Sequence, residues 1–283
     1  MVYTSTLTLY RKIRDEIKAV YGQEADMLAM FIVEDVSGFS STDILTDHKF
    51  VTGPNFRATI RKYILQLKKQ EPIQYILGKA FFYERIYKVN HSTLIPRPET
   101  EELVKLVLEC LNAKESQNVL DIGTGSGCIA ISLALNSPAS KVVALEESKS
   151  ALNIAQLNAD RLKAPIKFIH ANIFSYQGND KYDVIVSNPP YVRESEKKKM
   201  NKNVLMYEPA KALFVPDNDP LIFYERIAEF SRKVLNKRGG LFFEINEGLA
   251  LKVTQTMQNY GFQKVKITKD LNGKDRFVHG III

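Results

Sequence analysis

The chain of 283 residues contains only two cysteines, Cys110 and Cys128. One falls in a stretch with helical periodicity and the other in a glycine-rich loop, so the sequence predicts no disulfide framework. Two isolated thiols of this kind are typical of proteins in a reducing compartment, and we expect the chain to be cytoplasmic.

The sequence also lacks long apolar runs and clustered metal ligands. No run approaches the roughly 18 apolar residues that a membrane-spanning helix needs, and the chain does not start with a basic region followed by an apolar core. We therefore expect no membrane partner. The four histidines occur singly, at positions 48, 91, 170 and 279, so we expect no metal site.

Positively charged residues are in modest excess over negatively charged ones. The formal net charge is +7 at pH 7, while the hydrophobic content of 45% is ordinary for a globular protein. An excess of positive charge suits an acidic partner such as nucleic acid, but many lysine-rich proteins bind none. The length fits one large domain or two unequal ones.

The first part of the chain, residues 1–72, predicts a small helical domain. One apolar stripe recurs at intervals of four, four and three residues; it consists of Leu9, Ile13, Ile17 and Val20. Two further helices are expected at 24–36 and 56–70, with Phe31 among the inward-facing residues of the first. No catalytic residue stands out here, so we expect a structural or substrate-positioning role.

Residues 73–98 lack the helical periodicity of the first segment, and we expect them to form a linker. The aromatic segment 80–89 is expected to form a β-hairpin with the residues around 93–95. Prolines on both sides of Arg97 indicate a stiff connector, and either Glu99 or Thr100 is expected to cap the helix that follows.

From residue 99 to the end, strands and helices alternate, which predicts an α/β domain with a mainly parallel sheet. The last two strands are separated only by a turn at Asn272-Gly273 and therefore form an antiparallel hairpin. The predicted strands cover 118–122, 141–145, 166–169, 183–187, 240–245, 263–268 and 276–282. The predicted helices cover 127–136, 149–162, 220–236 and 247–260.

A glycine-rich loop follows the first of these strands. It has the spacing G-x-G-x-G and an acid, Asp121, two residues before it; its members are Gly123, Thr124, Gly125, Ser126 and Gly127. Dinucleotide sites use G-x-G-x-x-G, and an acid at this place would repel a pyrophosphate but attract an ammonium group. After the next strand, Glu146 is placed to accept both hydroxyls of a ribose. S-adenosylmethionine, with its sulfonium, ammonium and adenosine, is the cofactor that matches these groups.

The next strand is followed by Asn172 and Ile173. The Asn172 side chain could bond the adenine amino group, with Ile173 packing on the ring. The alternative is that Asn172 simply forms a turn.

The fourth strand runs into a rigid polar corner, Asn188-Pro189-Pro190-Tyr191. The two prolines end the strand because neither has a backbone N–H. The Asn188 side-chain oxygen and the Pro189 carbonyl can each accept one hydrogen of a planar amino group, while Tyr191 offers a flat face for stacking. The corner therefore suits an amide or aromatic amine as nucleophile, unless it is only a turn. The glycine loop favours the first interpretation, in which Asn188 also borders the cofactor.

Four segments together resemble the protein-(glutamine-N5) methyltransferases of peptide chain release factors. They begin at Glu71, Leu94, Asp121 and Val186 and read EPIQYILG, LIPRPETE, DIGTGSG and VSNPPY. Two further stretches also fit, EPAKAL at 208–213 and DRFV at 275–278. The resemblance implies a Rossmann-like class I methyltransferase sheet, a helical N-terminal domain and a hairpin linker. It also implies that the substrate is the glutamine of the Gly-Gly-Gln loop of release factors, whose methylation supports translation termination.

The sequence departs from this family at three positions. The family usually has Asp at Glu146 and at Asn172, and Gly at Asn246. Glu146 keeps the carboxylate, whereas Asn172 loses one.

Two other functions use some of the same residues. Adenine-N6 methyltransferases of nucleic acids share the Asn-Pro-Pro-Tyr corner, but the chain shows no separate target-reading domain, so we expect no stable nucleic-acid partner. A non-catalytic module that retains cofactor affinity is the second alternative. Turnover with an acceptor separates it from an enzyme.

Overall fold

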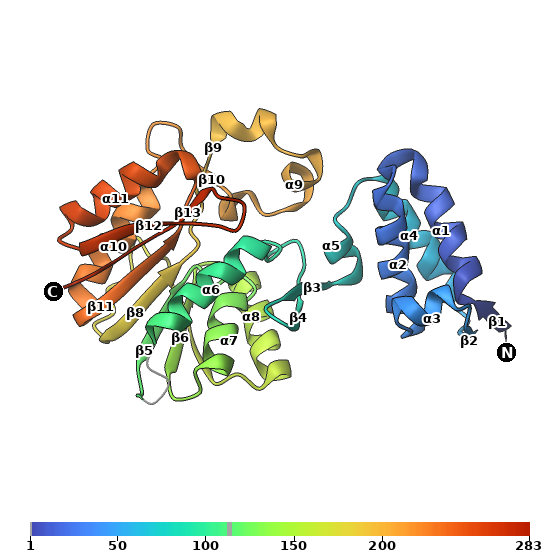
Figure 1. The fold of residues 1–283 in the computed structure, drawn as a ribbon, viewed down its shortest axis with the longest axis horizontal. Coiled ribbons are helices and arrows are strands. Elements are labelled where there is room, and N and C mark those ends of the chain that lie inside the picture. The colour runs from blue at the N-terminus through green and yellow to red at the C-terminus, as the bar shows by residue number, and fades with distance from the viewer. Residues whose placement is uncertain (1, 112–114) are drawn as a thin grey trace. The chain divides into compact units, whose positions relative to one another are not determined.

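The computed structural model describes residues 2–111 and 115–283, and these divide into two compact units. The first comprises Met1–Gly78 together with Lys202–Tyr207, and the second comprises Lys79–Asn201 and Glu208–Ile283. Helices dominate the first unit and a seven-stranded sheet forms the centre of the second (Figure 1).

The N-terminal unit is a helical bundle with one short antiparallel ribbon. Its helices are α1 (Thr6–Tyr21), α2 (Glu24–Ser37), α3 (Ser41–Leu45), α4 (Phe56–Lys68) and α5 (Ile73–Leu77). The ribbon pairs β1 (Val2–Ser5) with β2 (Lys49–Thr52) and was not predicted. The helix α9 (Lys202–Tyr207) belongs to this unit, where the Tyr207 hydroxyl donates to the Lys69 carbonyl across 2.9 Å.

The predicted apolar faces of the first two helices are correct except at two positions. In α1 the buried stripe continues from Ile17 toward Tyr21, whose hydroxyl donates to the Leu67 carbonyl, and Val20 is 41% exposed. In α2 the buried residues are 25, 28, 29, 32 and 33, which lie on one helical face. Phe31 lies off that face and is 39% exposed.

A two-stranded hairpin opens the second unit, but not with the predicted pairing. Strand β3 (Lys79–Phe82) pairs with β4 (Arg85–Lys88), and residues 93–95 are not in a strand. The turn residues Tyr83 and Glu84 both have positive φ, at 45° and 61°. This is the backbone of a type I′ hairpin turn, which Asn and Gly usually form, so no residue of the turn signals it in the sequence.

The central sheet has the strand order β12-β13-β11-β8-β5-β6-β7. Its strands are β5 (Asn118–Ile122), β6 (Lys141–Glu146), β7 (Ile166–His170), β8 (Tyr182–Ser187), β11 (Leu235–Glu244), β12 (Gln263–Lys269) and β13 (Asp275–Ile281). All neighbouring pairs are parallel except the two that involve β13. This confirms the predicted class I methyltransferase sheet with its C-terminal antiparallel hairpin.

Two apolar cores hold helices on opposite faces of the sheet (Figure 1). The helices of one face are α6 (Pro98–Cys110), α7 (Cys128–Asn136) and α8 (Lys149–Leu162), and those of the other are α10 (Ile222–Val234) and α11 (Ala250–Asn259). Because both faces are covered, β5 and β8 consist largely of buried apolar residues, as central parallel strands do.

A long insertion between β8 and α10 contains only short elements. In the second unit these are β9 (Val192–Arg193), the 3₁₀ turns η1 (Glu194–Lys199) and η2 (Ala210–Ala212), and β10 (Phe214–Val215). A further 3₁₀ turn, η3 (Glu247–Leu249), precedes α11. No helix among the described residues is long and apolar enough to cross a membrane.

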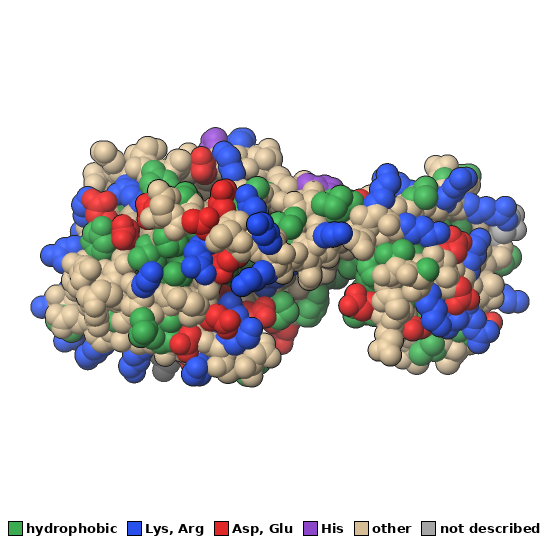
Figure 2. Space-filling view, turned by 90° about the horizontal axis from the view of Figure 1, so that it is seen from above, with side chains coloured by type: hydrophobic (Ala, Val, Ile, Leu, Met, Phe, Trp, Pro, Cys, Tyr) green, Lys and Arg blue, Asp and Glu red, His purple; other side chains and the backbone are tan. Residues whose placement is uncertain are grey.

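Surface charge is mixed in sign on the face that Figure 2 shows. There, Lys and Arg side chains lie scattered among Asp and Glu side chains on both units. This face therefore shows no single basic stripe.

Candidate functional site

The glycine loop and the Asn-Pro-Pro-Tyr corner lie next to each other. Strands β5 and β8 are parallel neighbours, so the loop after Ile122 and the corner after Ser187 leave the sheet at the same edge. The Ser187 hydroxyl donates to the Ile122 carbonyl across 2.7 Å and ties the two strand ends together. The chain continues from β5 toward β6 on one side and from β8 toward β11 on the other, which is the switch point where open parallel sheets bind ligands.

A cavity of about 590 Å³ opens at this edge, within the size range of cofactor sites. Its walls come from the glycine loop, the ends of β6 and β8, and two segments around Pro96 and Pro209. Among the predicted site residues it is lined by Gly123, Thr124, Gly125, Ser126, Glu146, Ile173, Asn188, Pro189 and Pro190.

The three loop glycines differ in what their missing side chains allow. All have positive φ, where an L-residue is strained. A Cβ on Gly127 would lie 3.0 Å from the Ile131 side chain and 3.2 Å from Ala155, so this glycine permits close packing of α7 and α8. A Cβ on Gly123 would meet no atom within 4 Å, and one on Gly125 would meet the Gly123 carbonyl oxygen at 4.0 Å, so both positions leave bare backbone facing the cavity.

Asp121 lies beneath the loop rather than at the cavity wall. Its side chain is fully buried, and Oδ2 accepts from the Thr124 hydroxyl at 2.6 Å and from the Ala130 N–H at 3.2 Å. Oδ1 has no hydrogen-bond partner among the described residues. Burial raises the pKa of this carboxyl to about 7. Asp121 thus supports the loop from below, and its contact with a ligand ammonium group stays a prediction.

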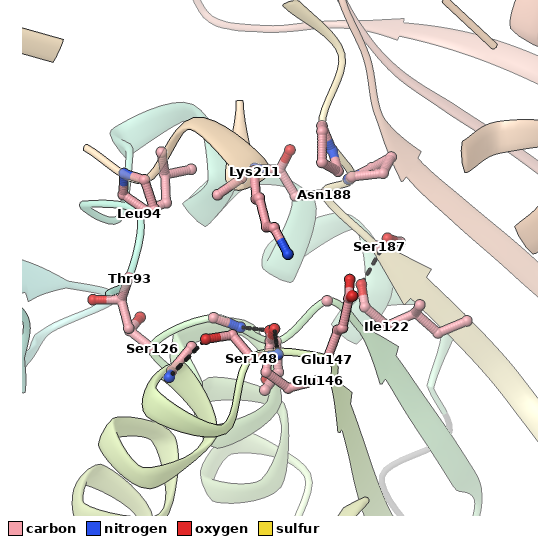
Figure 3. A pocket seen from close by; sticks show the side chains of 18 of the residues that line it. Thr93, Leu94, Ile122, Ser126, Glu146, Glu147, Ser148, Ser187, Asn188 and Lys211 are labelled. Carbon is pink, nitrogen blue, oxygen red and sulfur yellow. Dashed lines mark hydrogen bonds between the residues drawn. The ribbon is translucent and has the colours of Figure 1, made fainter. Parts of the chain in front are cut away.

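Glu146 holds the loop from the side. Its Oε2 accepts from the Gly125 N–H at 2.9 Å and its Oε1 accepts from the Ser148 N–H at 2.8 Å (Figure 3). A carboxylate has about four acceptor positions, so each oxygen retains a lone pair for a ligand. The longer Glu side chain thus satisfies both backbone amides while still lining the cavity.

Asn172 and Ile173 have different surroundings. Ile173 is buried and lines the cavity, whereas Asn172 does not line it. The Asn172 Oδ1 accepts from the Phe174 N–H at 2.7 Å, which is the contact of an Asx turn. Contact of Asn172 with adenine stays a prediction.

The polar corner is anchored by residues from two other elements. The Asn188 Nδ2 donates to the Thr100 hydroxyl of α6 at 3.3 Å, and the Tyr191 hydroxyl donates to Glu244 Oε1 of β11 at 3.2 Å. Thr100 therefore does not cap α6; Arg97 holds the capping position without a side-chain cap bond, and the Thr100 hydroxyl reaches Glu244. Tyr191 is partly buried and does not line the large cavity.

A second, small cavity of about 40 Å³ borders the corner. Asn188 and Pro189 line both cavities, while Tyr191 lines only the small one. The corner thus contributes residues to the walls of both cavities.

Sequence reasoning missed two charged residues of the large cavity. Lys211 extends its ammonium group into the open space, and Glu147 borders the cavity beside Glu146 (Figure 3). Glu147 lies outside every motif, and Lys211 lies in the stretch 208–213 that fits the family but was given no role. Within residues 2–111 and 115–283, no cluster of His, Cys, Asp and Glu could hold a metal ion.

Two family models match this chain. Residues 99–217 match the Methyltransferase small domain, and residues 8–78 match the PrmC N-terminal domain. Together the two matches cover parts of both units.

Curated relatives match nearly the whole chain. A release factor glutamine methyltransferase of Bacteroides thetaiotaomicron is 43% identical over 269 residues, covering 94% of this chain and 96% of that protein. The protein of the same name from Bacillus subtilis is 35% identical, with 92% of each chain covered. One from Flavobacterium psychrophilum is 48% identical over 76% of this chain and 77% of its own length.

Solved structures share the fold at low sequence identity. A methyltransferase from Pyrococcus furiosus aligns with a TM-score of 0.52 at 17% identity, covering 81% of this chain and 98% of that one. The T. thermophilus 16S rRNA N2 G1207 methyltransferase, in complex with AdoMet and guanosine, aligns with a TM-score of 0.53 at 16% identity, covering 72% of this chain and 50% of that one. At this identity the two likenesses show the fold alone.

Proposed function

Because the chain belongs to the release factor glutamine methyltransferase family, we propose that it methylates the side-chain amide nitrogen, N5, of the glutamine in the Gly-Gly-Gln motif of peptide chain release factors. The chain is an S-adenosylmethionine-dependent protein-glutamine methyltransferase. One observation carries the finer assignment: Asn188 and Pro189 form a wall common to a cofactor-sized cavity and a smaller cavity.

The residues of the large cavity fit the cofactor. The glycine loop supplies backbone, and the end of β6 supplies a carboxylate, to the wall of this cavity. The backbone at Gly123 and Gly125 is open to close approach, and Glu146 has free lone pairs for ribose hydroxyls. S-adenosylmethionine bound there supplies an electrophilic methyl group on a cationic sulfur.

The chain's own contribution to the reaction is to hold a weak nucleophile. The lone pair of a carboxamide nitrogen is shared with its carbonyl, so the nitrogen must be fixed and stabilised as it becomes positive. The Asn188 Oδ1 and the Pro189 carbonyl accept its two hydrogens, which orients the nitrogen and offsets the growing charge. Orientation of a well-placed pair contributes up to about 7–11 kcal/mol.

Tyr191 closes the substrate side of this arrangement. It lines the small cavity, and its ring is held in place by the hydrogen bond to Glu244. A ring fixed in this way can pack against the planar amide group of a glutamine. No general base is required before attack, since the proton can leave to water afterwards.

We further propose that the helical segment 1–72 positions the release factor, with 73–98 as a hairpin linker to the methyltransferase domain at 99–283. The residues that line the cavity all lie between His91 and Ile227, so the helical segment supplies none of its walls. An intact release factor should then have a much lower KM than a short Gly-Gly-Gln peptide. Equal KM values for the two would contradict this role.

The test of the proposed function is intact-mass spectrometry of an unmodified release factor incubated with the protein and S-adenosylmethionine. A parallel tube contains DNA, the substrate of adenine methyltransferases that share the corner. The proposal expects the mass increase of one methylation on the release factor and none on the DNA. Methylated adenine without methylated release factor would overturn it. Release factors act in the cytoplasm, which stays the expected compartment.

A further inference from the structure

A buried carboxylate stands behind the polar corner. Glu244, the last residue of β11, is 1% exposed and accepts two hydroxyl groups. The Thr100 Oγ1 donates to its Oε2 at 2.7 Å, and the Tyr191 hydroxyl donates to its Oε1 at 3.2 Å. Burial raises the pKa of this carboxyl and the nearby charge of Glu99 adds to the rise, while the two hydroxyl donors and the positive charge of Arg276 partly offset it.

The carboxylate sets the direction of a short chain of hydrogen bonds. Glu244 Oε2 accepts from Thr100 Oγ1, so the single hydroxyl hydrogen of Thr100 is committed to Glu244. The Thr100 oxygen then faces Asn188 as an acceptor. Asn188 must present its Nδ2 group to it, at 3.3 Å, and its Oδ1 is left as the acceptor available to a substrate N–H.

The opposite orientation of the Asn188 amide is disfavoured twice. Turned by 180°, its oxygen would face the Thr100 oxygen with no hydrogen between them. Its two N–H hydrogens would also meet the hydrogens of the substrate amide. A carboxamide that adopted both orientations equally would accept the substrate N–H only part of the time and would stabilise the reacting nitrogen less.

We propose that Glu244 is a positioning residue that, through Thr100, holds the Asn188 carboxamide with its oxygen toward the glutamine amide of the substrate. This inference rests on the proposed function, because it requires a substrate that donates N–H groups to Asn188. Glu244 also accepts the Tyr191 hydroxyl. One buried carboxylate therefore holds both ends of the corner, Tyr191 directly and Asn188 through Thr100.

The experiment compares Thr100→Val with Thr100→Ser. Valine keeps the shape of threonine but has no hydroxyl, and serine keeps the hydroxyl. Turnover (kcat) and KM are measured with a release factor, and the Kd of S-adenosylmethionine is measured by calorimetry. Thr100→Val should lower kcat by about 10- to 100-fold while the Kd changes much less, and Thr100→Ser should recover most of the lost turnover.

A double-mutant cycle tests whether Glu244 acts through Thr100. Glu244→Gln alone should lower kcat, because an amide can donate to Thr100 and reverse the chain. In the Thr100→Val background the same change should have a smaller effect, since the link to Asn188 is already gone and only the contact of Glu244 with Tyr191 remains.

The outcomes separate the inference from the proposed function. A wild-type protein that does not methylate the release factor overturns the proposed function and this inference with it. A wild-type protein that does methylate it, beside a Thr100→Val variant with normal kcat, overturns the positioning role alone. If the double variant loses kcat by the full product of the two single-variant losses, the positioning role is also overturned.

Discussion

The guanidinium group of Arg97 donates to the carboxylate of Glu208 across 2.6 Å and joins segments that lie 111 residues apart in the chain. The second oxygen of Glu208 accepts from the Ile95 N–H at 3.2 Å. Both segments line the large cavity. The stiff connector expected around Arg97 is thus joined to the segment around Glu208. We call this set of contacts, Arg97 and Ile95 to Glu208, the clamp of the cavity wall.

Glu208→Gln should weaken this clamp. The Glu208 side chain is 1% exposed and that of Arg97 is 34% exposed, so the loss is smaller than for a fully buried pair. We expect the free energy of unfolding to fall by about 1–3 kcal/mol, measured by urea denaturation. The exposed pair of Lys167 and Asp180 provides the control. Lys167→Gln should cost less than about 0.5 kcal/mol, and equal losses for both variants would contradict the account.

Asn188→Ala should lower turnover far more than it lowers cofactor affinity. It removes an acceptor that stabilises the substrate nitrogen as it becomes positive, for which a loss of about 100-fold in kcat is expected. The cofactor keeps the glycine loop and Glu146, so its Kd, measured by calorimetry, should change only a few-fold. Near-normal kcat in Asn188→Ala would rule out the proposed mechanism.

Gly125→Ala should impair cofactor binding beyond any effect on stability. Gly125 has φ +57° and borders the cavity. Gly38 also has a left-handed backbone, with φ +73°, a Cβ added there would meet no atom within 4 Å, and it ends α2 in the N-terminal unit. Each alanine should cost about 1 kcal/mol of stability from backbone strain. Only Gly125→Ala should raise the Kd of S-adenosylmethionine; a similar rise in Gly38→Ala would contradict the assignment of the loop.

Asp121 should make the stability of the cofactor-free protein depend on pH. Burial raises its folded-state pKa to about 7, above the value near 4 in an unfolded chain. The folded state therefore holds the proton more tightly. The stabilisation from Asp121 is complete below about pH 4 and is lost as the pH rises through about 7.

The variant Asp121→Asn isolates this effect, because it cannot ionise and can still accept from Thr124. Relative to this variant, the wild type should lose on the order of 3 kcal/mol in free energy of unfolding between pH 4 and pH 8. Urea denaturation at several pH values measures the difference. Parallel pH curves for the two proteins would show that Asp121 does not titrate in this range.

The sequence predicted the central sheet because its strands are short, apolar and β-branched and its loops carry glycine and proline. It failed where a contact distant in sequence decides the structure. Tyr83 and Glu84 form a tight turn without glycine, and Tyr21 rather than Val20 meets α4 through Leu67. The conformational preferences of neighbouring residues do not depend on partners that are distant in sequence, so a sequence pattern cannot predict these contacts.

The same limit applies to the site. The glycine loop and the corner were found because each is a local motif, and their adjacency followed from the order of parallel strands. Thr100 meets a partner 144 residues away, and the two partners of Glu208 lie 113 and 111 residues away, so these roles became visible only in the structure. Glu147 carries no pattern that would distinguish it from a surface charge, and for Lys211 the resemblance of 208–213 to the family implied no role.

The central claim is that the substrate nitrogen is that of the glutamine in the Gly-Gly-Gln motif. The most direct test is fragmentation mass spectrometry of the peptide that contains this motif, taken from a release factor treated with the protein and S-adenosylmethionine. The account predicts a single added methyl group on the glutamine side chain, absent when Asn188→Ala replaces the wild type at equal time. A methyl group on another residue of the factor, with this glutamine unmodified, would contradict it.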